Sequence, residues 1–138
     1  MVMHPSSLQW FIETYIEKPP EKITEYKEIE KIVCDETNVH PDLLFNKTRK
    51  REVVEARYLS MFFACKILLD SAGKKYTLDK AGMRYGLDHS TTLHGNRTVI
   101  DLYEVNMDFK RLTDKCLSRL HVKPWEVFDK IKVYGNKL

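Results

Sequence analysis

The sequence predicts an all-α protein with a single helical domain. No stretch alternates apolar and polar residues as a half-buried strand would, whereas apolar residues recur at a spacing of three and four. The chain has 138 residues, of which 43% are hydrophobic and 31% charged, as in a folded rather than a disordered protein. This length suits one domain with a core of its own.

The first half of the chain is expected to hold three helices and one short helical turn. A short helix precedes Pro19 and Pro20, which end it, and a second helix spans residues 21–39 with apolar positions on one face. Pro41 opens a turn of helix that runs to Phe45. Residues 53–69 are apolar on most sides, so this segment is the expected central buried helix.

The second half is expected to be helical with tight turns. Gly73 ends the central helix, and Thr77 caps a helix of about two turns that reaches Arg84. Gly86 allows a tight turn, after which Asp88 caps a long helix. Two further helices are expected over residues 108–120 and 124–133.

Charge is unevenly distributed along the chain. Residues 1–46 contain four Lys against nine Asp and Glu, a net −5, whereas residues 47–138 contain 19 Lys and Arg against 11 Asp and Glu, a net +8. A basic second half indicates a surface that faces a polyanion.

Composition also narrows the cellular setting. The three cysteines are far apart in the sequence, which is typical of reduced thiols rather than disulfides or a metal site. The first residues lack a basic leader, and the longest apolar run, residues 58–69, contains Lys66 and is too short to cross a bilayer. We therefore expect a soluble cytoplasmic protein that is not associated with a membrane.

Five polar residues in succession, Asp88 to Thr92, begin the long helix, where one cap would be enough. A catalytic triad does not fit, because consecutive helical side chains point about 100° apart. A metal site does not fit, because His89 and His94 are five residues apart and helical ligands need three or four. With no GxxxxGK[ST] or GxGxxG motif, we expect no nucleotide, no cofactor and no enzymatic activity, a hydrolase using His89 being the least favoured alternative.

The remaining explanation is a helix end that contacts a polar ligand. A short helix, a glycine turn and a capped longer helix form a helix-turn-helix, whose second helix enters the major groove of DNA. Asp accepts from a cytosine amino group, and Ser and Thr bond either way. From spacing alone, an ordinary cap followed by ordinary first-turn residues explains the stretch equally well.

Three segments resemble the DNA-binding domain of DnaA, the bacterial replication initiator. The stretch DHSTTLHGNRTV is similar to that family's signature, GGRDHTTVLHAxRKI. TLDKAGMRYG resembles the short helix before it, and VHPDLLFNKTRKREVVEARYLSMFFACKIL resembles the basic loop and the helix that follows. The resemblance covers roughly residues 28–120.

The resemblance implies a fold like that of the Trp repressor and the DnaA C-terminal domain, and a site on double-stranded DNA. In that family the Asp, His and two hydroxyl residues of the signature meet bases, and an arginine of the basic loop enters the minor groove. Transferred by position, the base-reading residues are Asp88, His89, Ser90 and Thr91, and the loop arginine is Arg49.

Further basic residues are expected on the DNA backbone. Four cations lie within five positions of the loop: Lys47, Arg49, Lys50 and Arg51. Weaker candidates for phosphate contacts are Arg57, Lys74, Lys75, Thr77 and Arg97. Arg97 has an alternative, an ion pair with Asp101 one turn further along the helix.

Two departures from the family pattern bear on the specificity of the site and on the stability of its helix. Tyr85-Gly86-Leu87 replaces the family's GGR, so the arginine before the aspartate is absent and the consensus DnaA box need not be the target. Gly95 and Asn96 replace Ala and a longer residue, which is expected to weaken the helix slightly.

Together these features predict a sequence-specific DNA-binding protein without ATPase activity. It would act either in the initiation or control of replication, by binding at a replication origin, or in transcriptional regulation. The alternative is a helical protein–protein interaction module that has lost specific DNA reading. Residues 28–120 are the expected DNA-binding domain, flanked by helical extensions over residues 1–27 and 121–138. The aromatic residues of the extensions, Trp10, Phe11, Trp125 and Phe128, are expected to seal the core, and a homodimer contact is the alternative. A replication or regulatory protein is a further candidate partner.

Overall fold

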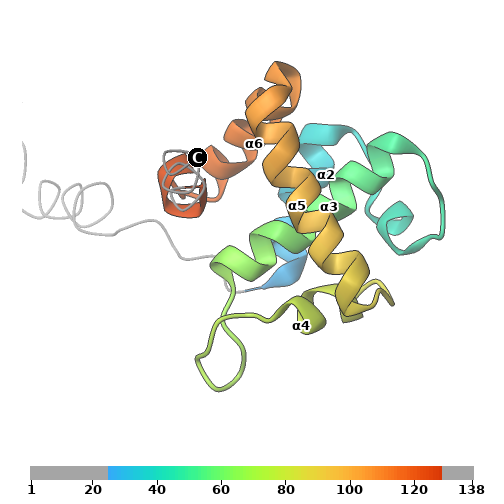
Figure 1. Cartoon of the computed structure of the whole chain (residues 1–138), viewed down its shortest axis with the longest axis vertical. Coiled ribbons are helices and arrows are strands. Elements are labelled where there is room, and N and C mark those ends of the chain that lie inside the picture. Colours follow the sequence, from blue (N-terminus) through green and yellow to red (C-terminus); the bar gives the residue numbers. More distant parts are fainter. Residues whose placement is uncertain (1–24, 129–138) are drawn as a thin grey trace, which may run out of the picture.

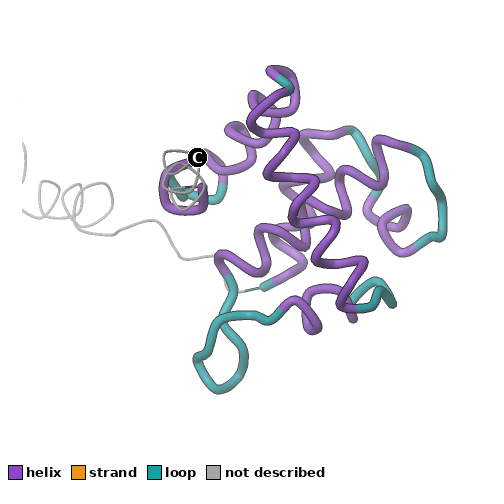
Figure 2. The backbone as a smooth tube through the Cα atoms, viewed as in Figure 1, coloured by secondary structure: helices purple, strands orange, loops and turns teal. Residues whose placement is uncertain are grey.

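The computed structural model describes residues 25–128, and this part of the chain is all-α (Figures 1 and 2). Its elements are α2 (Tyr26–Thr37), the 3-10 helix η2 (Pro41–Phe45), α3 (Arg51–Ile67), α4 (Leu78–Met83), α5 (His89–Val105) and α6 (Met107–Arg119). Residues 124–128 are helical again. None of the helices within residues 25–128 is long and apolar enough to cross a membrane.

Helix α3 lies at the centre of the fold, as its apolar sequence predicts. Nine of its 17 residues are buried, and Phe62 and Phe63 are fully enclosed. It packs against α2, α4 and α5, and α5 in turn packs against α4 and α6 (Figure 1). Fully burying one large apolar side chain stabilises a fold by about 1.5–3 kcal/mol, so the α3 core holds the other helices in place.

The predicted caps of α4 and α5 are confirmed. The Thr77 hydroxyl accepts a hydrogen bond from the Lys80 N–H at the start of α4, and Asp88 does the same for Thr91 in α5. Asn106 is both the last cap of α5 and the first cap of α6, where its side chain accepts from the Phe109 N–H. One residue therefore makes the corner between these two helices.

Several boundaries differ from the sequence-based prediction. Helix α3 begins at Arg51, two residues earlier than expected, so the basic loop is short and its last arginine is helical. Helix α2 begins at Tyr26 because Glu25 is extended, and it ends where Asn38 takes a left-handed conformation (φ 57°). The predicted helix before Pro19, and the end of the last one, lie outside the described residues.

The C-terminal end of the described chain is held by one aromatic ring. Phe128 stacks on Tyr103 of α5 with 3.8 Å between ring centroids, and it also stacks on Phe62 of α3. Phe128 is thus the core-sealing residue the sequence predicts, but Trp125 is 59% exposed and does not seal the core. Trp125 follows Pro124 at the start of the last helical segment and faces outward.

All three cysteines are free thiols. Burial raises the pKa of Cys34 to about 11 and that of Cys116 to about 12, because a charged thiolate is disfavoured away from water. These groups are neutral packing residues, in agreement with the prediction of reduced thiols.

Two glycines allow α5 to lie close to its neighbours α4 and α3. A Cβ atom on Gly82 of α4 would lie 2.0 Å from the Thr92 hydroxyl oxygen, and one on Gly95 of α5 would lie 2.7 Å from the Tyr58 ring of α3. The expectation that Gly95 merely weakens its helix is therefore incomplete. Glycine at position 95 lowers helix propensity, but it also allows α5 to approach Tyr58 of α3 closely, which an alanine would obstruct.

A buried carboxylate joins the first described helix to the turn after α4. Glu30 of α2 is 5% exposed and accepts two hydrogen bonds from the Arg84 guanidinium and one from the Tyr85 hydroxyl. The pKa of Arg84 is raised, chiefly by its hydrogen bond to Glu30. The Tyr26 hydroxyl donates to the Ala81 carbonyl nearby, so α2 holds both α4 and the turn after it.

We expect the Arg84→Ala variant to lose about 3 kcal/mol of unfolding free energy, because it leaves the Glu30 carboxylate buried without its cation. The matched control is Arg119→Ala, which removes an arginine paired with Asp35 at the surface and should destabilise the protein much less, because water screens an exposed ion pair. Urea unfolding followed by circular dichroism measures both. Equal destabilisation of the two variants would contradict a special role for the Glu30 ion pair.

Candidate nucleic-acid interface

Helices α4 and α5 form the predicted helix-turn-helix. Gly86 has a positive φ of 70° in the turn between them, as expected from the sequence. The backbone N–H groups of Tyr85 and Leu87 both donate to the Gly82 carbonyl, which closes the turn tightly. The packing of Gly82 against Thr92 then sets how closely the two helices cross.

Asp88 is the N-cap of α5. Its Oδ1 accepts from the Thr91 backbone N–H at 2.8 Å. Hydrogen bonds from the Thr91 side chain and backbone lower the pKa of the Asp88 carboxyl. A lowered pKa in the folded state means that this cap contributes stability above the unfolded-state pKa and loses it as pH falls through the folded-state value.

The five successive polar residues have different environments. Ser90 is exposed and Thr91 is partly exposed on the first turn of α5. Thr92 is fully buried, and its hydroxyl donates to the Asp88 carbonyl and packs on Gly82. The polar surplus therefore includes one cap, one packing residue and residues that face outward.

His89 is bound to a residue that the sequence did not single out. Its Nδ1 lies 3.0 Å from the Asp79 carboxylate of α4, and both side chains are exposed. Within the described residues, Asp79 is the only hydrogen-bond partner of the His89 ring. Ser90, the next residue along the helix, makes no hydrogen bond with the His89 ring.

The basic loop is exposed between η2 and α3, at the right-hand edge of Figure 1. Lys47, Arg49 and Lys50 are all exposed. The predicted fourth cation of this group, Arg51, is in α3 and pairs with Glu55 one turn on, while its side chain remains 73% exposed. The four cations thus share one edge of the molecule.

The base of this loop is fixed to both α3 and the helix-turn-helix. Arg57 is only 8% exposed, and its guanidinium donates to the carbonyl oxygens of Leu44 and Asn46. The Phe45 ring lies 5.3 Å from that of Tyr85, measured between centroids, and the Arg84 guanidinium lies over Phe45. The base of the loop and the turn after α4 are therefore in direct contact.

Burial changes the expectation for Arg57. A side chain that is 8% exposed and bonded to two backbone carbonyls is not presented to a phosphate. Arg57 instead donates hydrogen bonds to the backbone carbonyl oxygens of Leu44 and Asn46, at the end of η2. Arg57 and the exposed loop cations look alike in the sequence, because burial is decided by the packing of η2 on α3.

The other residues predicted to contact the DNA backbone lie around the helix-turn-helix. Lys74 and Lys75 are exposed on the loop before α4, whose shape is set by Asp70 through hydrogen bonds from the Ala72 and Lys74 N–H groups. Asp70 also pairs with Lys80. Thr77 uses its hydroxyl as the cap of α4.

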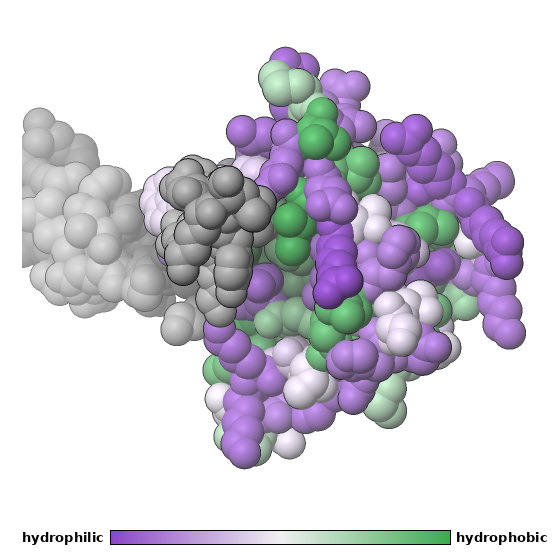
Figure 3. All heavy atoms as spheres, viewed as in Figure 1, coloured by the Kyte–Doolittle hydropathy of each residue, from purple (hydrophilic) through white to green (hydrophobic). Residues whose placement is uncertain are grey.

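Arg97 is exposed on the third turn of α5. Within the described residues Arg97 forms no ion pair with Asp101, so the alternative considered for Arg97 does not occur in this structure. Figure 3 shows hydrophilic side chains along the right-hand edge, where Figure 1 places the basic loop, and a mixture of hydrophilic and hydrophobic ones along the lower edge, near the helix-turn-helix.

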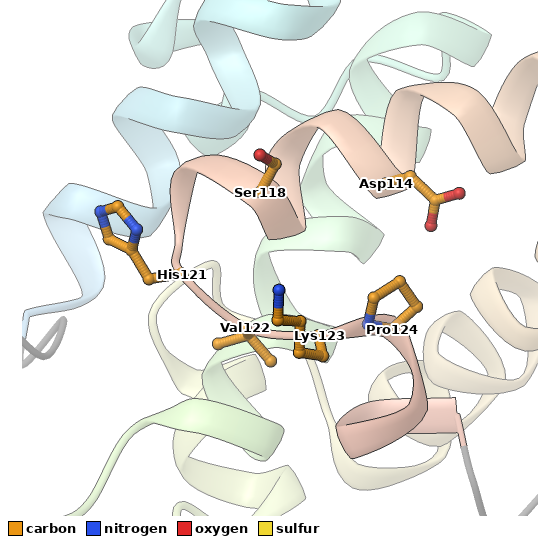
Figure 4. Close-up of a pocket in the computed structure, with 6 residues that line it drawn as sticks. All are labelled: Asp114, Ser118, His121, Val122, Lys123 and Pro124. Atoms are coloured by element: carbon orange, nitrogen blue, oxygen red, sulfur yellow. The ribbon is translucent and has the colours of Figure 1, made fainter. Parts of the chain in front are cut away.

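A shallow hollow of about 480 Å³ lies at the opposite end of the fold (Figure 4). It is formed by the end of α6 and the turn that follows, with Asp114, Ser118, His121, Val122, Lys123 and Pro124 lining it. Asp114 already accepts from the Tyr103 hydroxyl. Among residues 25–128 no cluster of three or more His, Cys, Asp or Glu side chains is placed to hold a metal ion.

This geometry defines the helix-turn-helix class, in which the second helix carries residues that read the major groove. The chain belongs to the helix-turn-helix family of the bacterial DnaA protein, whose model matches residues 26–99. It is similar to the chromosomal replication initiator protein DnaA of Flavobacterium psychrophilum, with 38% identity over 96 residues. That match covers 67% of this chain and 18% of the relative's length.

Two Asp88 variants test its role as the cap of α5. We expect Asp88→Ala to lower the unfolding free energy, because the Thr91 N–H loses its acceptor. Asp88→Asn keeps an oxygen acceptor, so it should destabilise the protein much less than Asp88→Ala does. Chemical denaturation measures both, and equal destabilisation by the two changes would argue against the cap.

Proposed function

We propose that this chain is a sequence-specific double-stranded DNA-binding protein that acts in the control of replication initiation or in transcriptional regulation. It binds DNA in the cytoplasm, on the nucleoid, and needs neither nucleotide nor catalysis for this step. The proposal is supported above all by one observation: the turn that leads into the exposed, capped start of α5 packs on the base of an exposed loop of cations.

The two parts of this surface suit different features of duplex DNA. The first turn of α5 carries short polar side chains that reach base edges, here Asp88, Ser90 and Thr91, with His89 beside them. Arg49 is the loop residue assigned to the minor groove, where a narrow groove attracts a cation. Because Phe45 packs on Tyr85, both parts engage the DNA in a fixed register.

Phosphate contacts are assigned to the exposed cations. These are Lys47, Lys50, Arg51, Lys74, Lys75 and Arg97, with Thr77 adjacent to the lysine loop. Arg57 is assigned a positioning role instead, since it holds the base of the loop. Each phosphate that a cation neutralises adds about −0.9 to the dependence of log affinity on log salt concentration.

Leu87 is expected to change the preferred DNA sequence. It stands where the family signature has arginine, and its side chain is partly buried against the core. A side chain that contributes to packing leaves that position without a cation at the groove. The target is therefore proposed to differ from the consensus DnaA box at the base pair that the missing arginine would read.

Fluorescence anisotropy across a salt series tests the proposal with three duplexes: a DnaA box, a one-base variant of it and a random sequence. We expect a steep salt dependence with all three and stronger binding to a site recovered from a random library. Selectivity for the box would show that Leu87 does not redirect reading. No binding to any duplex at low salt would contradict the proposal and favour the protein–protein interaction module.

Variants test the division of roles on the selected site. Ser90→Ala and Thr91→Ala should each reduce discrimination by about 1–3 kcal/mol, because the hydroxyl that reads one base pair is removed. Lys47→Ala and Lys50→Ala should weaken binding to every sequence and reduce the salt slope by about 1 each. The same effect from both groups of variants would count against separate reading and anchoring parts.

A further inference from the structure

His89 is the first residue of α5, and its imidazole is held by α4 through Asp79. We propose that Asp79 is a positioning residue that fixes the tautomer and direction of His89, so that its Nε2 accepts a hydrogen bond from the exocyclic amino group of a base. This inference rests on the proposed function, because it assigns a specificity to the same DNA-binding surface.

The hydrogen bond with Asp79 determines which ring nitrogen carries the proton. An ionised carboxylate only accepts hydrogen bonds, so the His89 Nδ1, 3.0 Å away, is the donor. In the neutral ring the lone pair is then on Nε2. Asp79 lies in the first turn of α4, so the carboxylate that binds His89 belongs to a different helix from His89 itself.

A ring fixed in this tautomer discriminates between bases. In the major groove, adenine and cytosine present an amino donor, whereas guanine and thymine present only hydrogen-bond acceptors. An accepting Nε2 therefore favours adenine or cytosine at the position that it meets. An imidazole without Asp79 could present either nitrogen as donor or acceptor, and this selection would disappear.

A second role for Asp79 makes the opposite prediction. Its side chain is 69% exposed beside the DNA-reading helix, so its charge also repels phosphates. If repulsion were its only effect, removing the carboxylate would tighten binding to all sequences alike. If it positions His89, removing it abolishes discrimination at one base pair.

The tautomer can be measured in the free protein by nitrogen-15 NMR of the histidine ring. We expect His89 to be protonated at Nδ1 in the parent, and Asp79→Ala to shift the ring toward the Nε2-protonated form that prevails in water. Asp79→Asn should keep the parent form, because its amide oxygen still accepts. A parent ring protonated mainly at Nε2 would overturn the inference.

The reading itself is measured on the duplex selected by the parent protein. Each adenine is replaced in turn by purine, and each cytosine by 2-pyrimidinone, which removes only the amino group. One such replacement should weaken binding by the parent about tenfold, whereas binding by His89→Ala and by Asp79→Ala should not change with it. The double variant, with both His89 and Asp79 replaced by Ala, should lose no more discrimination than either single variant. Asp79→Asn should retain most of the parent's discrimination.

Asp108→Ala is the matched control, since Asp108 is also an exposed first-turn carboxylate but lies at the start of α6. It should leave discrimination at every base pair unchanged. Uniformly tighter binding by Asp79→Ala, with the parent's discrimination retained, would overturn the inference while leaving the proposed function in place. Absence of selective duplex binding by the parent would instead overturn the proposed function and, with it, this assignment.

Discussion

The ion pair between Glu30 and Arg84 is the constraint on which the proposed DNA-binding surface depends. A carboxylate that is 5% exposed is costly unless it is paired, and here it accepts from the Arg84 guanidinium and the Tyr85 hydroxyl. The Arg84 guanidinium also lies over the rings of Tyr26 and Phe45. One arginine thereby connects α2, the turn of the helix-turn-helix and the residue that precedes the basic loop.

This connection explains how a loop and a helix start can act together. A loop of exposed cations has little order of its own, and ordering it on binding costs conformational entropy. Arg57 and Phe45 remove part of that cost beforehand, because they fix the carbonyls and the ring at the base of the loop. The cations themselves remain exposed at the tip, where they can follow a phosphate backbone.

Close packing sets the geometry of the reading helix. Thr92 faces Gly82 and is fully buried, so the helix presents Ser90 and Thr91 outward in a defined rotation. Asp88 and Asp79 then act on neighbouring groups, one as the cap of the backbone and the other as the partner of His89. In the proposed function the polar stretch that starts α5 combines folding and recognition in adjacent residues, which is why its composition alone supports both interpretations.

The order of helices, the caps at Thr77 and Asp88 and the turn at Gly86 were all predictable from sequence, because they depend on local hydrogen bonds and backbone conformation. The signature residues likewise identify the family from the sequence alone. Three features were not predictable: the burial of Arg57, the pairing of Asp79 with His89 and the ion pair of Glu30 with Arg84. Each joins residues ten or more positions apart, so only the packing of the helices decides which charged side chains are enclosed and which face solvent.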